Sequence, residues 1–312
     1  MLRNTLLLLS TAVALASCTP GGSIDPEPAT PAEAAAGPAI GPGTVRSADG
    51  VEIAYTAHRL ADPNLVLVHG WMCDQSYWEA QVPVLAEAFG VVTVDLAGHG
   101  DSGSDRQAWT TASLGRDVEA VIDQLQLKRV IVVGHSMGGR VALEVARLLP
   151  RRVMGVIGVD TLHDADARPD PDQIEAMLAG FTNDFAAACD GFVRPMFAAT
   201  ADEIVIDRIA ADMCAGPGPV GVALLRDYVA YDTAAAMQAA GVPVRGINAD
   251  RWPTDAAANQ KYCDFDVTII PGVGHFLMQE APVQLNTALI ETVPVSYTHL
   301  TLPTTIKPGG GG

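Results

Sequence analysis

Basic residues are scarce in this sequence of 312 residues. Its 19 lysines and arginines stand against 36 aspartates and glutamates, which gives a formal net charge of −17 at pH 7. Such a chain repels phosphate groups, so we expect no nucleic-acid partner. A second feature that the sequence lacks is any spacing of histidines, cysteines and carboxylates typical of a metal site. We therefore expect no metal and no other cofactor.

Long apolar runs are also few. The run from Leu6 to Ala16 is short for a membrane span. Arg3 precedes it and small residues follow it, which is the pattern of an export signal. We therefore interpret residues 1–18 as a signal peptide.

The end of this segment, Leu15-Ala16-Ser17-Cys18, resembles the bacterial lipobox. The resemblance implies that Cys18 is lipidated and becomes the new N-terminus; a plain secretory signal is the alternative. Thr19 in place of the aspartate linked to inner-membrane retention favours the outer membrane. The protein would then be an exported lipoprotein that faces the periplasm or the cell exterior and touches the membrane only through its anchor. Residues 19–43 are rich in Pro, Gly and Ala, and we expect a disordered tether.

Only five cysteines are present. Export makes disulfides permissible for those other than Cys18. A bond between Cys189 and Cys214 is plausible, whereas Cys73 and Cys263 are either free or paired, because spacing does not determine connectivity.

Strand patterns alternate with helical patterns along most of the chain. Strands are predicted near residues 44–46, 51–58, 65–69, 91–96, 130–133, 153–160, 242–248 and 267–270, and helices near 75–89, 111–125, 139–149, 255–262 and 282–291. This alternation predicts an α/β fold with a mostly parallel central sheet flanked by helices. From about 164 to 240 the pattern is helical throughout, with segments at 173–181, 185–196, 202–213 and 220–237, which predicts an all-helical lid insertion.

The C-terminal end has a different character. Residues 295–304 resemble a translated sequencing adaptor, so we interpret 295–312 as an artefactual tail, which leaves the natural C-terminus undetermined. The predicted divisions are a signal peptide (1–18), a tether (19–43), a core (44–163 and 241–294), a lid (164–240) and the tail (295–312).

The stretch from Val130 to Gly139 reads V-I-V-V-G-H-S-M-G-G. An apolar strand, a G-x-S-x-G turn and a helix in succession are typical of a nucleophile elbow. Side chains two residues either side of the serine would clash in so tight a turn, which explains Gly134 and Gly138. The elbow presents Ser136 as a nucleophile.

Three motifs together resemble the α/β-hydrolase fold. They are His69-Gly70-Trp71, Gly134–Gly139 and Gly272-Val273-Gly274-His275-Phe276, in the right order and at predicted strand ends. The resemblance covers about residues 44–294 and is close to the lidded, esterase-like branch often labelled as carboxylesterases of the pimeloyl-ester type. It implies a serine hydrolase with a Ser-Asp-His triad.

A serine hydroxyl needs a base to take its proton, and His275 is the best candidate. For the acid that orients His275 we favour Asp250, which follows the strand at 242–248, where the family normally places it. The usual spacing, three residues after the strand-end glycine, instead gives Ala249. Asp160, which ends the preceding strand, is the alternative acid.

The oxyanion hole should use the backbone N–H groups of Trp71 and Met137. The substrate pocket is expected to include Gly70, Trp71, Met137, Phe276 and Leu277. We predict hydrolysis of a small-molecule carboxylic ester through an acyl-enzyme. A lactonase on the same triad is the alternative, and a non-catalytic ligand-binding signalling homologue is less favoured. The sequence leaves the acyl and alcohol preferences and the oligomeric state open.

Overall fold

The computed structural model describes residues 40–168 and 170–298. The predicted signal peptide, the lipidation site at Cys18, nearly all of the tether and the last 14 residues of the tail lie outside the described residues. Within the part that is described, no helix combines the length and the hydrophobicity needed to cross a membrane.

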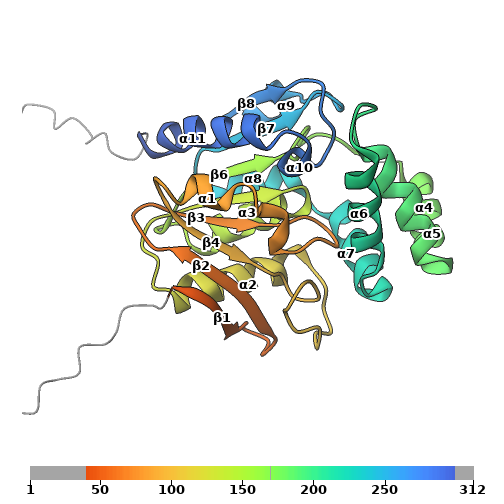
Figure 1. Ribbon diagram of the computed structural model, residues 1–312, viewed down its shortest axis with the longest axis horizontal. Helices are drawn as coiled ribbons and strands as arrows, with labels where there is room; N and C mark the ends of the chain where they lie inside the picture. The colour runs from red at the N-terminus through yellow and green to blue at the C-terminus, as the bar shows by residue number, and fades with distance from the viewer. Residues whose placement is uncertain (1–39, 169, 299–312) are drawn as a thin grey trace, which may run out of the picture. The chain divides into compact units, whose positions relative to one another are not determined.

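Eight strands of the described chain form one sheet, in the order β1-β2-β4-β3-β5-β6-β7-β8 (Figure 1). The pairs β1–β2 and β2–β4 are antiparallel and all other pairs are parallel. The strands are β1 (Gly41–Arg46), β2 (Glu52–Arg59), β3 (Asn64–Val68), β4 (Gly90–Val94), β5 (Val130–His135), β6 (Val153–Val159), β7 (Val244–Ala249) and β8 (Phe265–Ile270). The predicted α/β class with a mostly parallel sheet is confirmed.

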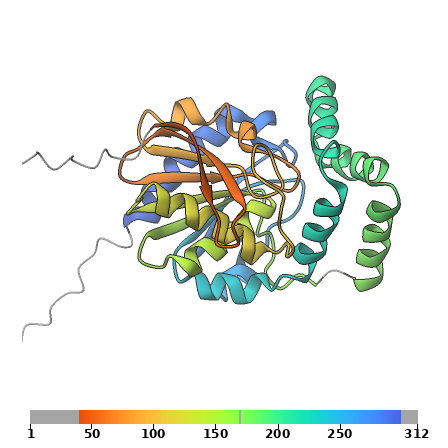
Figure 2. The same ribbon diagram turned by 90° about the horizontal axis from the view of Figure 1, so that it is seen from below.

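The central strands are buried on both faces, which is why their sequences are continuous apolar runs rather than alternating ones. On one face α2 (Thr111–Gln124), α3 (Met137–Leu148) and α8 (Thr233–Ala240) pack side by side (Figures 1 and 2). The other face is covered by α1 (Val82–Leu85) and α11 (Pro282–Thr298). The remaining short helices outside the insertion are η1 (Gln75–Trp78), α9 (Ala256–Gln260) and α10 (Leu277–Glu280).

Some predicted boundaries are wrong. The predicted helix at 75–89 is two short pieces, η1 and α1, and Pro83 stands in the first turn of α1, where its missing N–H removes no helical bond. The predicted tether ends earlier than residue 43, because Gly41–Gly43 pair with β2. Helix α11 continues to Thr298, beyond its predicted end and into the segment interpreted as a tail.

The predicted helical insertion lies between β6 and β7. It contains α4 (Pro171–Asn183), α5 (Phe185–Val193), η2 (Arg194–Met196), α6 (Glu203–Cys214) and α7 (Gly218–Ala230), which lie together on one side of the core (Figure 2). We call residues 171–230 the cap. The predicted helix at 220–237 is two helices, because Asp232 caps the separate helix α8 through the Ala235 N–H. Helix α8 packs on α3 rather than in the cap.

A disulfide joins Cys189 of α5 to Cys214 of α6. Among the described cysteines, Cys73 and Cys263 are free thiols. The bond links two cap helices that also contact one another, so it restricts the cap without connecting it to the core.

Replacing both Cys189 and Cys214 by serine should destabilise the protein by about 3 kcal/mol, because the crosslink restricts a 25-residue loop of the unfolded chain. The free energy of unfolding from urea titrations measures this loss. Replacing Cys263 by serine is the control, since that thiol is unpaired. An unchanged free energy of unfolding in the double variant would contradict the disulfide between Cys189 and Cys214.

Candidate active site

Ser136 stands at a sharp turn between β5 and α3. Its φ of 53° and ψ of −117° lie in a region of backbone angles that residues other than glycine rarely occupy. A Cβ at Gly134 would lie 2.1 Å from the Gly138 carbonyl oxygen, and one at Gly138 would lie 2.5 Å from the His69 carbonyl oxygen. The turn therefore has the backbone that a nucleophile elbow requires. Both glycines are needed because a side chain at either position would clash with the neighbouring backbone, as the sequence suggests.

The imidazole of His275 is held by Asp160. Its Nδ1 lies 2.6 Å from Oδ2 of Asp160, a distance typical of a charge-assisted hydrogen bond. The Asp160 side chain is fully buried. Its other oxygen, Oδ1, accepts a hydrogen bond from the Ala249 N–H at 2.8 Å. Each carboxylate oxygen thus has a donor, which compensates for burial of the charge.

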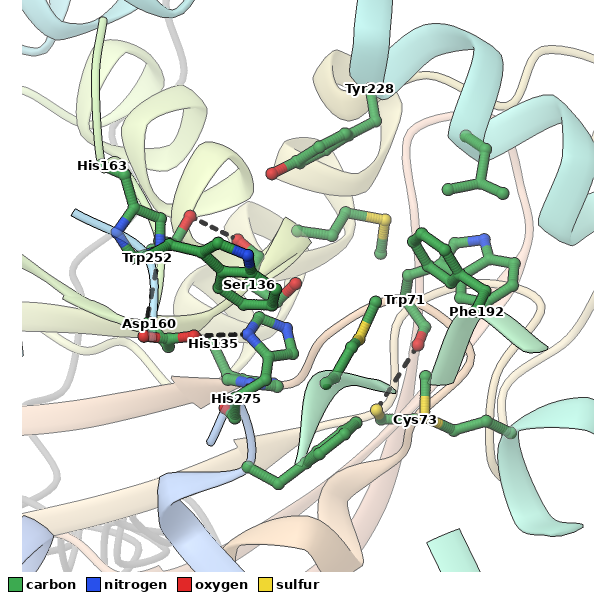
Figure 3. Close-up of a pocket in the computed structure, with 16 residues that line it drawn as sticks. Trp71, Cys73, His135, Ser136, Asp160, His163, Phe192, Tyr228, Trp252 and His275 are labelled. Atoms are coloured by element: carbon green, nitrogen blue, oxygen red, sulfur yellow. Dashed lines mark hydrogen bonds and ion pairs between the residues drawn. The ribbon is translucent and has the colours of Figure 1, made fainter. Parts of the chain in front are cut away.

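The structure corrects the favoured assignment of the acid to Asp250. The carboxylate of Asp250 is exposed and accepts a hydrogen bond from the Gly272 N–H at 2.9 Å instead of one from His275. The reason lies at the end of β7, where the Ala249 N–H is directed at Asp160 and the following side chain turns outward. The alternative acid from the sequence, Asp160, occupies the position behind His275 (Figure 3).

The loop that carries His275 is fixed by backbone contacts. The His275 N–H donates to the Met196 carbonyl of the cap at 2.9 Å. Glu280 accepts hydrogen bonds from the amides on both sides of His275, those of Gly274 at 2.9 Å and Phe276 at 3.2 Å. The carboxylate of Glu280 also accepts from the Ala198 N–H. The position of the imidazole therefore depends on both the core and the cap.

Two buried histidines shape the surroundings of Ser136. His69 donates from Nδ1 to the Gly70 carbonyl at 2.8 Å and accepts at Nε2 from the Leu96 N–H at 3.0 Å. His135 donates from Nε2 to the His275 carbonyl at 3.0 Å. Burial lowers the pKa of His69 to about 4 and that of His135 well below the usual value, so both are neutral at pH 7. They act as fixed hydrogen-bond partners rather than as bases.

The His69 contact also orients the candidate oxyanion hole. Since a trans peptide holds its C=O and N–H on opposite sides, fixing the Gly70 carbonyl toward His69 turns the Trp71 N–H the other way. A Cβ at Gly70 would lie 3.2 Å from Cβ of Ser136, which places this peptide beside the serine. Met137 is the first residue of α3, so its N–H has no partner within the helix. Both predicted donors are thus next to Ser136.

A cavity of about 270 Å³ opens over Ser136 (Figure 3). Its wall is almost entirely apolar and comes from both core and cap: Trp71, Cys73, His135, Ser136, Met137, Asp160, Thr161, His163, Phe192, Met196, Met213, Leu225, Tyr228, Trp252, His275 and Phe276.

Of the predicted pocket residues, Trp71, Met137 and Phe276 line the cavity. Gly70 and Leu277 are not part of the wall: Gly70 packs behind it against His135, and Leu277 is fully buried in α10.

The cap side of this wall was not predicted from the sequence. Phe192, Leu225 and Tyr228 come from helices whose apolar residues serve equally to pack the cap, so no local pattern marks them as pocket residues. Trp252 lies just past the end of β7 and packs edge-on against the His275 ring, with 5.5 Å between centroids. Trp252 stands two positions after Asp250, the acid favoured from the sequence, and this position is the one feature of the sequence that points to its place at the site.

Trp71 connects the oxyanion segment to the cap. Its Nε1 donates to the Gly221 carbonyl of α7 at 2.9 Å. Its ring contacts Phe181, Phe185 and Phe192, with centroids 5.6 to 5.9 Å away. The segment that carries a candidate oxyanion donor is therefore packed directly against cap helices.

The strand–turn–helix serine, the buried histidine–carboxylate pair and the sheet topology define an α/β protein with a nucleophile elbow. Residues 65–288 match the model of the alpha/beta hydrolase family, and the chain belongs to this family.

Curated relatives match parts of the chain. A pimeloyl-[acyl-carrier protein] methyl ester esterase of Edwardsiella ictaluri is 40% identical over 96 residues, which are 31% of this chain and 35% of that protein. A dihydrolipoyllysine-residue acetyltransferase component of an acetoin cleaving system, from Cupriavidus necator, is 31% identical over 140 residues, 45% of this chain and 35% of that protein. The chain thus matches about a third of the length of these relatives.

Solved structures share the fold over most of the chain. An esterase from Thermogutta terrifontis has a TM-score of 0.71 at 20% identity and covers 82% of this chain and 98% of its own. An enol-lactonase from Burkholderia xenovorans has a TM-score of 0.70 at 18% identity, with coverage of 81% and 100%.

The buried neutral histidines should make the free energy of unfolding fall at acidic pH. Burial lowers the pKa of His69 to about 4 and that of His99 to about 3, below the value of 6.5 in the unfolded chain. Below pH 6.5 the unfolded state therefore binds more protons than the folded state, and stability falls as the pH falls toward 4. Each such histidine should remove up to about 1.4 kcal/mol per pH unit.

Urea titrations at pH 7 and pH 5 measure this effect. The variant His69→Gln should lose less stability than the wild type over this interval, because one of the buried imidazoles is gone. Equal stability of the wild-type protein at the two pH values would contradict the neutral state of these rings.

Proposed function

We propose that this protein is a serine hydrolase that cleaves carboxylic esters through an acyl-enzyme, with Ser136 as nucleophile, His275 as base and Asp160 as acid. The observation that carries the proposal is the 2.6 Å contact between His275 Nδ1 and the buried Asp160, in the wall of the cavity that also contains Ser136. A carboxylate in this position keeps the proton on Nδ1 and leaves Nε2 free to accept one.

The proposed reaction has two steps. In the first, Ser136 Oγ attacks the ester carbonyl while His275 Nε2 takes the hydroxyl proton. The Trp71 and Met137 N–H groups stabilise the negative oxygen that forms, and the tetrahedral intermediate expels the alcohol, which receives the proton from His275. In the second, a water that gives its proton to His275 attacks the acyl-enzyme, and Ser136 leaves with that proton. The Asp160 carboxylate stabilises the imidazolium in both steps.

The apolar wall supports esters with hydrophobic parts as the substrate class. The esterase named among the curated relatives supports ester chemistry in the same family. A lactone is an ester whose alcohol and acyl parts are joined, so the same steps would open its ring. A panel that contains both linear esters and lactones therefore determines which of the two is the better substrate.

Ser136→Ala should lower kcat for a short-chain chromogenic ester by a factor on the order of 10⁶, because the nucleophile is removed. Covalent labelling by a fluorophosphonate should be lost as well. Thermal unfolding serves as the control and should be nearly unchanged, since alanine fits the same backbone. Retained hydrolysis by a folded Ser136→Ala protein would contradict the proposal.

Asp160→Asn should lower kcat by roughly 10³ to 10⁴, since the amide no longer keeps the correct tautomer of His275 and no longer balances its charge. Asp250→Asn is the matched control: it retains an acceptor for the Gly272 N–H, and its kcat should stay close to that of the wild type. The reverse result, with the large loss in Asp250→Asn, would show that the acid is Asp250.

A further inference from the structure

The two ends of the cavity over Ser136 differ in exposure. At one end lie Cys73, Met213 and Phe276, which are 3%, 3% and 0% exposed, so this end is closed and apolar. At the other end Trp252 is 37% exposed, and Tyr228 and His163 are half-buried. We call these the closed end and the mouth. In Figure 3 Cys73 lies to the lower right of Ser136, whereas Tyr228 lies above Ser136 and His163 lies to its upper left.

The hydroxyl of Tyr228 is a polar group that the fold itself does not use. Among the described residues it has no hydrogen-bond partner, and in Figure 3 it points from the cap into the cavity. The ring is nevertheless well fixed. The guanidinium of Arg140 lies 3.6 Å from its centroid, and Nη1 of Arg140 donates to the Tyr228 backbone carbonyl.

The order of events in the proposed mechanism determines which part of the substrate lies at each end of the cavity. The alcohol must leave before water attacks the acyl-enzyme, while the acyl group remains bonded to Ser136. An alcohol at the closed end would be trapped behind that acyl group. The acyl chain therefore belongs at the closed end, where no polar group would meet it, and the alcohol belongs at the mouth beside Tyr228.

On the basis of the proposed function, we infer that the substrates are esters of a short apolar acid with an alcohol that carries a hydrogen-bond acceptor, and that the Tyr228 hydroxyl donates to this acceptor. The cavity of about 270 Å³ limits the size of the substrate. A hydrogen bond from Tyr228 at the mouth of a mostly apolar cavity selects a substrate by its orientation as well as by its affinity.

Two esters test this inference directly. Butyl butanoate and 2-methoxyethyl butanoate have the same acyl group and the same number of non-hydrogen atoms, and differ by an ether oxygen in place of a methylene in the alcohol. The full-length wild-type protein should favour 2-methoxyethyl butanoate in kcat/KM by about two- to tenfold, the effect of one hydrogen bond. Tyr228→Phe should bring the ratio of the two values toward one.

Tyr231→Phe is the matched control. Its hydroxyl lies nearby at the end of α7 but donates to Glu144 at 2.7 Å and is not part of the cavity wall. This variant should keep the wild-type ratio. A second variant, Tyr228→Leu, removes ring and hydroxyl together and should also lose the preference.

A wild-type ratio near one, or an unchanged ratio in folded Tyr228→Phe, would overturn the inference while leaving the hydrolase proposal intact. The hydrolase proposal itself would fail, and this inference with it, if the wild-type protein cleaved neither ester and a fluorophosphonate did not label Ser136.

Discussion

The short hydrogen bond between His275 and Asp160 is the contact on which the site depends. It joins residues 115 positions apart in the chain, one at the end of β6 and one in the loop after β8, across the intervening strand β7. Strand β7 takes part, because the Ala249 N–H at its end binds the second carboxylate oxygen. Three neighbouring segments thus meet at a single carboxylate at the carboxyl ends of the strands. This is the side on which parallel α/β sheets generally bind ligands.

Around this contact, side chains of the core and groups of the cap hold the backbone segments that carry the site. The imidazoles of His69 and His135 hold backbone carbonyls of the oxyanion segment and of the His275 loop. Glu280 of α10 and the Met196 carbonyl of the cap fix the same loop. Because Trp71 is packed against cap aromatics, the cap and the candidate oxyanion donor cannot move independently. A displacement of the cap would therefore disturb the site as well as open the cavity.

The parallel sheet and the elbow could be predicted from the sequence, because both rest on local patterns: apolar strands at regular intervals, and glycines required by the turn around Ser136. Local patterns do not select the acid, since two carboxylates, Asp160 and Asp250, follow adjacent strands. The choice depends on which side chain turns inward, and that depends on the hydrogen bond of the Ala249 N–H. The spacing from Gly246 to Ala249 indicates that Asp250 departs from the family pattern. The cavity wall supplied by the cap could be read only from the packed structure, because pocket residues such as Tyr228 follow the same helical pattern as packing residues.

The hydrogen bond between His275 and Asp160 is measured most directly by the proton NMR signal of the His275 Nδ1–H. A short bond to a buried carboxylate shifts such a proton far downfield of the backbone amides. We expect a downfield imidazole resonance in the wild-type protein that survives in Asp250→Asn and disappears in Asp160→Asn. A resonance that persists in folded Asp160→Asn and vanishes in Asp250→Asn would contradict this expectation.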